Sequence, residues 1–176
     1  FFTTSEVPFR HLDYLDGVLD TPDGEPPKVS MLLKDYAGTL VLFNNGEIHY
    51  YGANGKGQAG RGTLTDTEQD GAFNRWGYAN VNRTGETKVL RGKKAIRIAM
   101  TLGNSTNTAT ACYALIENSA NSTPEIWHSG DNHYGQGATA GSVDNTVPTH
   151  ITDSGVNGWD RSTFGNPVDI WANGGT

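Results

Sequence analysis

One block of residues occurs twice in this chain of 176 residues, and the second copy keeps the order of the first. Four positions match at a constant separation of 78 residues, namely Ile48 with Ile126, Gly52 with Gly130, Asn54 with Asn132, and Gln58 with Gln136. Four matches in a single register are improbable by chance, so the chain contains an internal repeat. A repeated block of this kind predicts two successive units of the same supersecondary type.

The segments around the repeat have the composition of short β-strands. Glycine makes up 23 of the 176 residues, and Gly, Pro or Asn interrupts almost every window before two helical turns can accumulate. Short apolar segments rich in β-branched or aromatic residues, each bounded by turn residues, lie at 40–43, 47–51, 95–100, 111–116 and 125–128. The Asn44-Asn45-Gly46 step predicts a tight hairpin turn, because Asn and Gly tolerate a positive φ. We therefore expect an all-β fold.

A specific signature follows the second strand segment of each copy. In the first copy it reads Tyr50-Tyr51-Gly52-Ala53-Asn54-Gly55-Lys56-Gly57-Gln58-Ala59-Gly60-Arg61-Gly62, and the second copy runs from His128 to Gly137. The signature resembles the repeat of the regulator of chromosome condensation family, and we expect the second copy to lack the residue after Gln136. The resemblance implies four-stranded β-propeller blades. About two blades plus the opening strand of a third cannot close a ring, which implies an incomplete propeller or a fragment.

An apolar marker upstream of each copy divides the chain into repeats. It reads Pro8-Phe9-Arg10-His11-Leu12, then Ala95-Ile96-Arg97-Ile98-Ala99, then Pro167-Val168-Asp169-Ile170-Trp171-Ala172. We predict a single β domain over residues 1–176. Within it, residues 8–94 form a first blade-like repeat with polar insertions, 95–166 form a second, and 167–176 begin a third.

The charge and cysteine content exclude several classes of protein. Thirteen Lys and Arg residues stand against nineteen Asp and Glu residues, and no basic run compensates the net charge of -6. Nucleic acid is therefore a disfavoured partner. The single cysteine, Cys112, excludes an internal disulfide and a zinc site built on Cys pairs. No stretch approaches the ~20 apolar residues of a membrane-spanning helix, so we expect no membrane insertion.

We interpret the repeated polar and glycine positions as structural. Glycine permits a positive φ or a close approach of backbones, Asn holds turns through side chain to backbone bonds, and Gln bridges neighbouring backbone groups. This structural motif comprises Gly52, Asn54, Gly57, Gln58, Gly60, Gly130, Asn132, Gly135 and Gln136. Tyr134 and Trp159 lie in loop-like sequence, which makes them the candidates for contact with a ligand or partner.

Candidate catalytic and metal-binding patterns are weak. Residues 66–71 resemble the start of a calcium loop, but the position of the closing acidic residue holds Gly77. The five histidines form no close ligand pair, and the Gly-x-Ser-x-Gly turn of a serine nucleophile is missing. We therefore expect no catalytic residues, no metal and no cofactor.

Composition and motifs together favour a non-enzymatic structural or binding protein. The specific hypothesis is a component of a virion fibre, spike or decoration, such as a bacteriophage tail fibre. The protein would then lie at the surface of a virion or other extracellular particle. Its partners are then other protein subunits and a host surface receptor or glycan. Two alternatives stay open: a cytoplasmic propeller adaptor or guanine-nucleotide exchange factor for a small GTPase, and a carbohydrate-binding module.

Overall fold

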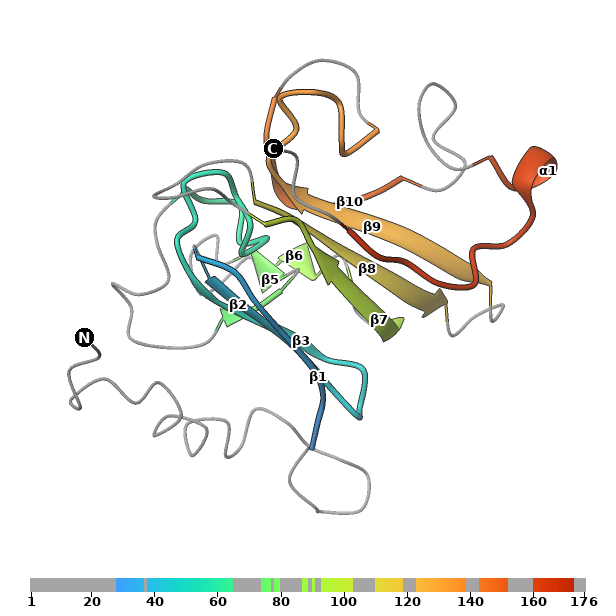
Figure 1. The fold of residues 1–176 in the computed structure, drawn as a ribbon, viewed down its shortest axis with the longest axis horizontal. Helices are drawn as coiled ribbons and strands as arrows, with labels where there is room; N and C mark the ends of the chain where they lie inside the picture. Colours follow the sequence, from blue (N-terminus) through green and yellow to red (C-terminus); the bar gives the residue numbers. More distant parts are fainter. Residues whose placement is uncertain are drawn as a thin grey trace.

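The computed structural model describes residues 28–36, 38–64, 74–76, 78–79, 87–88, 90, 93–102, 110–118, 123–138, 143–151 and 160–172 (Figure 1). Its elements are β1 (Val29–Lys34), β2 (Gly38–Phe43), β3 (Ile48–Gly52), β4 (Asn74–Arg75), β5 (Tyr78–Ala79), β6 (Thr87–Lys88), β7 (Lys93–Met100), β8 (Ala111–Asn118), β9 (Pro124–Gly130), β10 (Asn145–His150) and α1 (Arg161–Phe164).

The strands form two four-stranded antiparallel sheets. The first sheet has the order β1-β2-β3-β4, the second has the order β10-β9-β8-β7, and β5 pairs with β6 in a separate ribbon. Neighbours in each large sheet are consecutive in the chain, so each sheet is a four-stranded meander of the kind that makes a propeller blade. We call β1–β4 the first unit and β7–β10 the second unit. The all-β expectation is confirmed.

The two units have the same register at the start of their central hairpins. Gly38 at the start of β2 pairs with Gly52 at the end of β3, and Ala111 of β8 pairs with Gly130 of β9. Gly52 and Gly130 both adopt positive φ, at 136° and 104°. The glycines that the sequence aligned 78 residues apart therefore occupy equivalent places in the two units.

The opening strands of the units also match. The register of β1 against β2 shifts between Val29 and Met31, and that of β7 against β8 shifts between Ala95 and Arg97. One extra residue thus stands at the same place in both opening strands, which is the geometry of a β-bulge. The two units share an irregularity as well as a topology.

The structure places these opening strands differently from the sequence markers. β1, at 29–34, occupies the opening position of the first unit, whereas the predicted marker at 8–12 lies outside the described residues. The marker at 95–99 lies within β7, as expected. The third marker, at 167–172, belongs to neither sheet.

One apolar core joins the two units face to face. It contains Leu40, Leu42, Ile48, Tyr50 and Trp76 from the first unit, and Ala95, Ile98, Met100, Cys112, Ala114 and Ile116 from the second. Full burial of one large apolar side chain contributes roughly 1.5–3 kcal/mol, so this interface is a major source of stability.

The described part of the chain contains one short helix. Asp160 caps α1, and its carboxylate accepts a hydrogen bond from the backbone amide of Ser162 at 2.9 Å. No helix in the described ranges is long and apolar enough to span a membrane.

Candidate functional site

The loop that follows β3 folds around a buried asparagine. Asn54 donates from Nδ2 to the carbonyl oxygen of Thr63 at 2.8 Å and accepts at Oδ1 from the Ala59 amide at 2.8 Å. The backbone amide of Lys56 donates to Oε1 of Gln58 at 2.9 Å. Both polar atoms of the Asn54 side chain and Oε1 of Gln58 are therefore bonded to backbone groups of the same loop.

The loop that follows β9 repeats these bonds. Asn132 donates from Nδ2 to the Val143 carbonyl oxygen at 3.2 Å and accepts at Oδ1 from the Gly137 amide at 2.7 Å. The amide of Tyr134 donates to Oε1 of Gln136 at 2.8 Å. Asn132 thus stands where Asn54 stands in the first unit, and Gln136 where Gln58 stands.

No residue is missing directly after Gln136 in the described part of the second loop. Gly60 donates its amide to the Gly57 carbonyl at 2.9 Å, and Ala138 donates to the Gly135 carbonyl at 3.0 Å. Ala138 has φ 51°, close to the 64° of Gly60. The expected deletion after Gln136 is therefore wrong: Ala138 adopts the left-handed backbone of the missing glycine, which hides the match in the sequence.

Asn54→Ala and Asn132→Ala are each expected to lower the free energy of unfolding by about 2–3 kcal/mol, because each leaves a buried amide without a partner and removes a partly buried bond to a carbonyl oxygen. Urea titration measures the change. Asn44→Ala is the matched control, since its bond from the Lys28 amide is exposed; its cost is expected below about 1 kcal/mol. Equal losses in all three variants contradict the structural role of the repeated asparagines.

The two loops touch each other through charges and backbone. The Lys56 ammonium lies 3.2 Å from the Asp144 carboxylate and 3.6 Å from that of Asp131. A hydrogen bond to Asp144 raises the pKa of Lys56, and the Gly62 amide donates to the Thr146 carbonyl at 2.7 Å. Because Lys56 is partly exposed, each ion pair contributes at most about 1 kcal/mol; the pairs fix how the loops face each other.

Buried polar bonds tie the units together beneath the loops. Trp76 Nε1 lies 3.0 Å from the Gln58 carbonyl and 2.7 Å from Ser129 Oγ. A second such bond joins the residue before β8 to the residue after β1: Thr110 Oγ1 donates to the Asp35 carboxylate at 2.8 Å. Sequence analysis missed Trp76, Asp35 and Thr110 in this role, because bonds between residues so far apart leave no local pattern.

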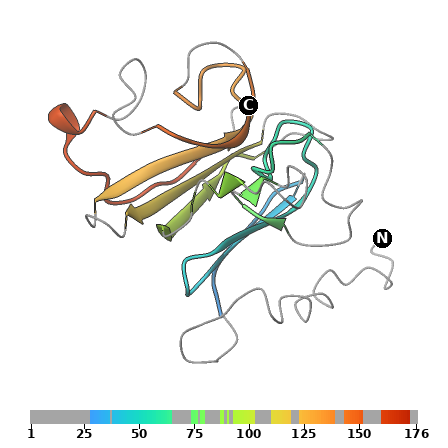
Figure 2. The same cartoon turned by 180° about the vertical axis from the view of Figure 1, so that it is seen from behind.

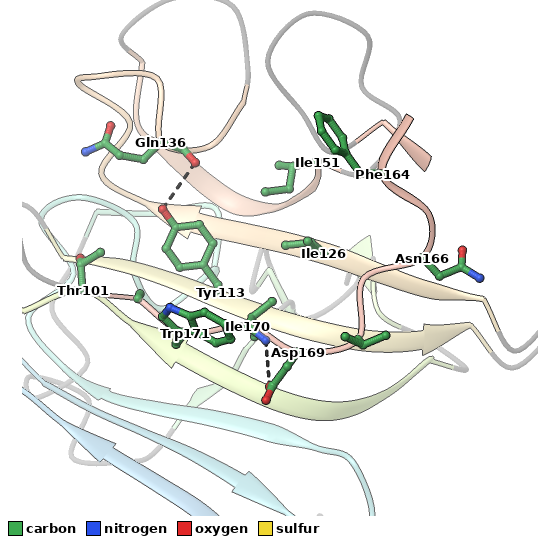
Figure 3. A pocket seen from close by; sticks show the side chains of 12 residues that line it. Thr101, Tyr113, Ile126, Gln136, Ile151, Phe164, Asn166, Asp169, Ile170 and Trp171 are labelled. Carbon is green, nitrogen blue, oxygen red and sulfur yellow. Dashed lines mark hydrogen bonds between the residues drawn. The ribbon is translucent and has the colours of Figure 1, made fainter. Parts of the chain in front are cut away.

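The opposite face of the second sheet carries a separate apolar cluster. Side chains alternate along β8, so Ala114 and Ile116 face the first unit while Tyr113 and Leu115 face away. The cluster on this outward face comprises Leu115, Ile126, Ala138 and Ile151, with Tyr113 and Ile170 packed against it. A pocket of about 720 Å³ opens beside it, lined by β8 and β9 on one side and by the segment after α1 on the other (Figure 3).

The segment at 166–172 lies across this outward face. Ile170 packs into the apolar cluster, and the Asp169 carboxylate lies 3.3 Å from Arg97 Nε on β7. Val168 and Trp171 are 88% and 84% exposed. The segment therefore covers part of the outward face of the second sheet, while its own Val168 and Trp171 side chains stay exposed.

Two histidines are buried and neutral. Burial lowers the pKa of His49 and of His128 to about 4. The Glu47 carboxylate lies 3.7 Å from His49 Nε2. His128 Nε2 lies 3.2 Å from the Asp131 carbonyl and Nδ1 lies 2.9 Å from the Asn145 amide nitrogen, an arrangement that suits the Nε2–H tautomer. Both rings are packed into the fold.

The remaining candidates divide between exposed and undescribed positions. Tyr134 is 85% exposed at the loop tip, where its ring meets His133 edge to face at 4.7 Å. Trp159 and the calcium-like loop at 66–71 lie outside the described residues. Burial raises the pKa of the Cys112 thiol. Within the described ranges, no group of three or more His, Cys, Asp or Glu residues is placed to hold a metal ion.

Comparison with known proteins finds likeness at the level of structure. No protein-family model matches the sequence, and no curated protein matches it significantly. The crystal structure of human WBSCR16 is similar at 22% identity with a TM-score of 0.51, over 73% of this chain and 26% of that one. The structure of Kap60 bound to yeast RCC1 (Prp20) is similar at 18% identity with a TM-score of 0.42, over 70% of this chain and 25% of that one.

The chain thus spans about a quarter of the length of these solved structures. The similarity to WBSCR16 is one of fold, and it agrees with the two bladed sheets and their shared irregularities. The chain has an all-β fold with propeller-type blades, and the resemblance to the regulator of chromosome condensation repeat holds at the level of that fold.

Proposed function

We propose that this chain is part of a non-catalytic, protein-binding propeller, and that it binds partners through the end of the units where the loops after β3 and β9 lie. Figure 2 shows these loops leaving the two sheets at the same end. The last residues of β1 and β7 and the first residues of β2 and β8 lie at this end too, because the strands are antiparallel. We call it the loop end.

The observation that supports the proposal is the exposure of large apolar side chains at the loop end. They are Tyr36, Leu64, Leu102, Tyr134 and Val143, each more than half exposed. Exposed apolar groups gathered on one side of a protein are typical of interaction surfaces. Beneath them, the side-chain oxygens of the repeated Asn and Gln residues accept hydrogen bonds from backbone amides, so these residues position the loops and leave recognition to the exposed side chains.

Affinity capture from the native source tests the binding surface. A chain with Leu64→Ser, Tyr134→Ser and Val143→Ser is compared with the unchanged chain, and Val29→Ser is the control because Val29 is exposed at the far end of β1. We expect a partner protein whose recovery falls by at least about tenfold with the triple variant, as hot-spot losses of this size do, and is unchanged with the control. Equal recovery with all three chains contradicts the proposal.

The class of partner is a separate question. A propeller-type fold supports a guanine-nucleotide exchange or adaptor role better than it supports a role in a virion. Acceleration of nucleotide release from candidate small GTPases supports exchange activity. No acceleration, together with recovery of the chain in purified virus particles, supports the fibre or decoration hypothesis. Loss of glycan-array binding in Tyr134→Ala supports the carbohydrate-binding alternative.

A further inference from the structure

The outward face of the second sheet is equivalent to the face of the first sheet that packs against the second unit. Leu40 pairs with Tyr50 across β2 and β3, and Tyr113 pairs with His128 across β8 and β9. The amide of the residue after the fourth strand donates to the third strand in both units, at 2.9 Å in each. The matched positions are Leu40 with Tyr113, Ile48 with Ile126, and Trp76 with Ile151.

The first-unit members of these pairs are buried against the second unit, while their counterparts line the pocket. Leu40, Ile48 and Trp76 belong to the core between the units. Tyr113, Ile126 and Ile151 line the 720 Å³ pocket. The pocket therefore lies where, one unit earlier in the chain, a whole sheet is seated.

Two equivalent glycines also show that the first unit is covered and the second is open. Gly57 and Gly135 have φ of 80° and 79° at the same place in their loops. A Cβ atom on Gly57 would lie 2.6 Å from Cα of Thr146 in the second unit, whereas a Cβ atom on Gly135 meets nothing within 4 Å. The space beside the second loop is open where the space beside the first loop is filled.

The segment at 167–172 lies where an opening strand belongs. In the first interface, β7 contacts β1 and β2 of the preceding unit. On the outward face, Asp169 contacts Arg97 of β7 and Ile170 packs against the cluster that includes Leu115 of β8. Because β7 and β8 are the counterparts of β1 and β2, this segment relates to the second unit as β7 relates to the first.

We propose that the outward face of the second sheet takes a third blade-like unit of the same polypeptide, that Pro167–Ala172 is its opening strand, and that its next strand fills the pocket. This inference does not rest on the proposed partner binding, and it shares only Tyr134 with the loop end.

The residues at the open face also define the chemistry of this third unit. Lys56 of the first unit meets carboxylates of the second, but its counterpart in the second loop is Tyr134. The third unit is therefore expected to present an uncharged side chain at the position of Asp131, because a buried charge without a partner is costly.

A duplication of the chain's own strands tests the proposal. Residues 101–151, which contain β8, β9 and β10, are repeated after Ala172, and the repeated copy carries Asp131→Ala because Tyr134 offers no cation. We expect the backbone amides of 168–172 to exchange hydrogen at least about tenfold more slowly than in the unextended chain, since strand pairing protects amides. We also expect the emission of Trp171, which is exposed in the unextended chain, to shift to the blue.

The matched control carries Ala114→Asp in the repeated copy alone, which places a charge on the face that must dock and leaves both original units unchanged. Fast exchange at 168–172 in the control and slow exchange in the parent extension support the proposal. Equal exchange in the two extended chains overturns it. Protection of 168–172 in the unextended chain that grows with protein concentration also overturns it, because a second copy then covers the face. The loop-end variant Leu64→Ser changes a residue of the first unit and leaves all these readouts unchanged, so the two proposals fail independently.

Discussion

Replacing Gly57 with alanine is expected to lower the free energy of unfolding by about 3 kcal/mol, whereas the same change at Gly135 costs only about 1 kcal/mol. Both residues have a left-handed φ near 80°, so both variants incur the same backbone strain. Only at Gly57 does the added methyl group press on the backbone of Thr146. The difference of about 2 kcal/mol is the cost of pressing the added methyl group against the second unit.

Urea titration of the two variants beside the unchanged chain measures these costs, and circular dichroism reports whether each variant keeps its sheets. The comparison controls itself, because the two glycines share φ, loop position and neighbouring hydrogen bonds. Equal losses at the two positions contradict the assignment of Gly57 to an interface between units.

Stability is expected to fall steeply as the pH drops from about 6.5 to about 4. Burial lowers the pKa of His49 and His128 from 6.5 to about 4. Between these values the unfolded chain binds protons that the folded chain does not, so protons favour unfolding; above pH 6.5 both states are neutral and this contribution is fully present. Each histidine accounts for up to about 3 kcal/mol across this window.

Thermal melts between pH 4 and pH 8 measure this dependence. The double variant His49→Gln and His128→Gln is expected to flatten the curve between pH 6.5 and pH 5, even where it lowers the melting temperature overall. The slope is therefore the readout, and the absolute stability is not. A variant that retains the full slope between pH 6.5 and pH 5 shows that other groups titrate there.

The duplicated motif predicted the strand-and-loop repeat well, for a local reason. Gly52 and Gly130 need a positive φ, and Asn54 and Asn132 bond to backbone a few residues away. Such requirements act within one loop, so they leave the same residues at the same spacing. The exception is Ala138, which adopts the glycine conformation without being glycine and so concealed part of the match.

The opening strand of the first unit was harder to predict. β1 has alternating exposure and no special residue, while a better apolar marker stood at 8–12, outside the described residues. The bulge that β1 shares with β7 depends on pairing with the neighbouring strand. The local sequence pattern does not indicate which strand will pair with β1.

By itself, the sequence determined that the chain is all-β, that it contains two related units, and that Asn and Gly shape its loops, because turn geometry and strand alternation are written in neighbouring residues. Only the tertiary structure decided that Trp76 binds Ser129, that Thr110 binds Asp35, and that one face of the second sheet is open. These features join positions distant in the chain. They exist only after whole sheets have packed, and burial of apolar faces, which carries no directional signature in the sequence, selects that packing.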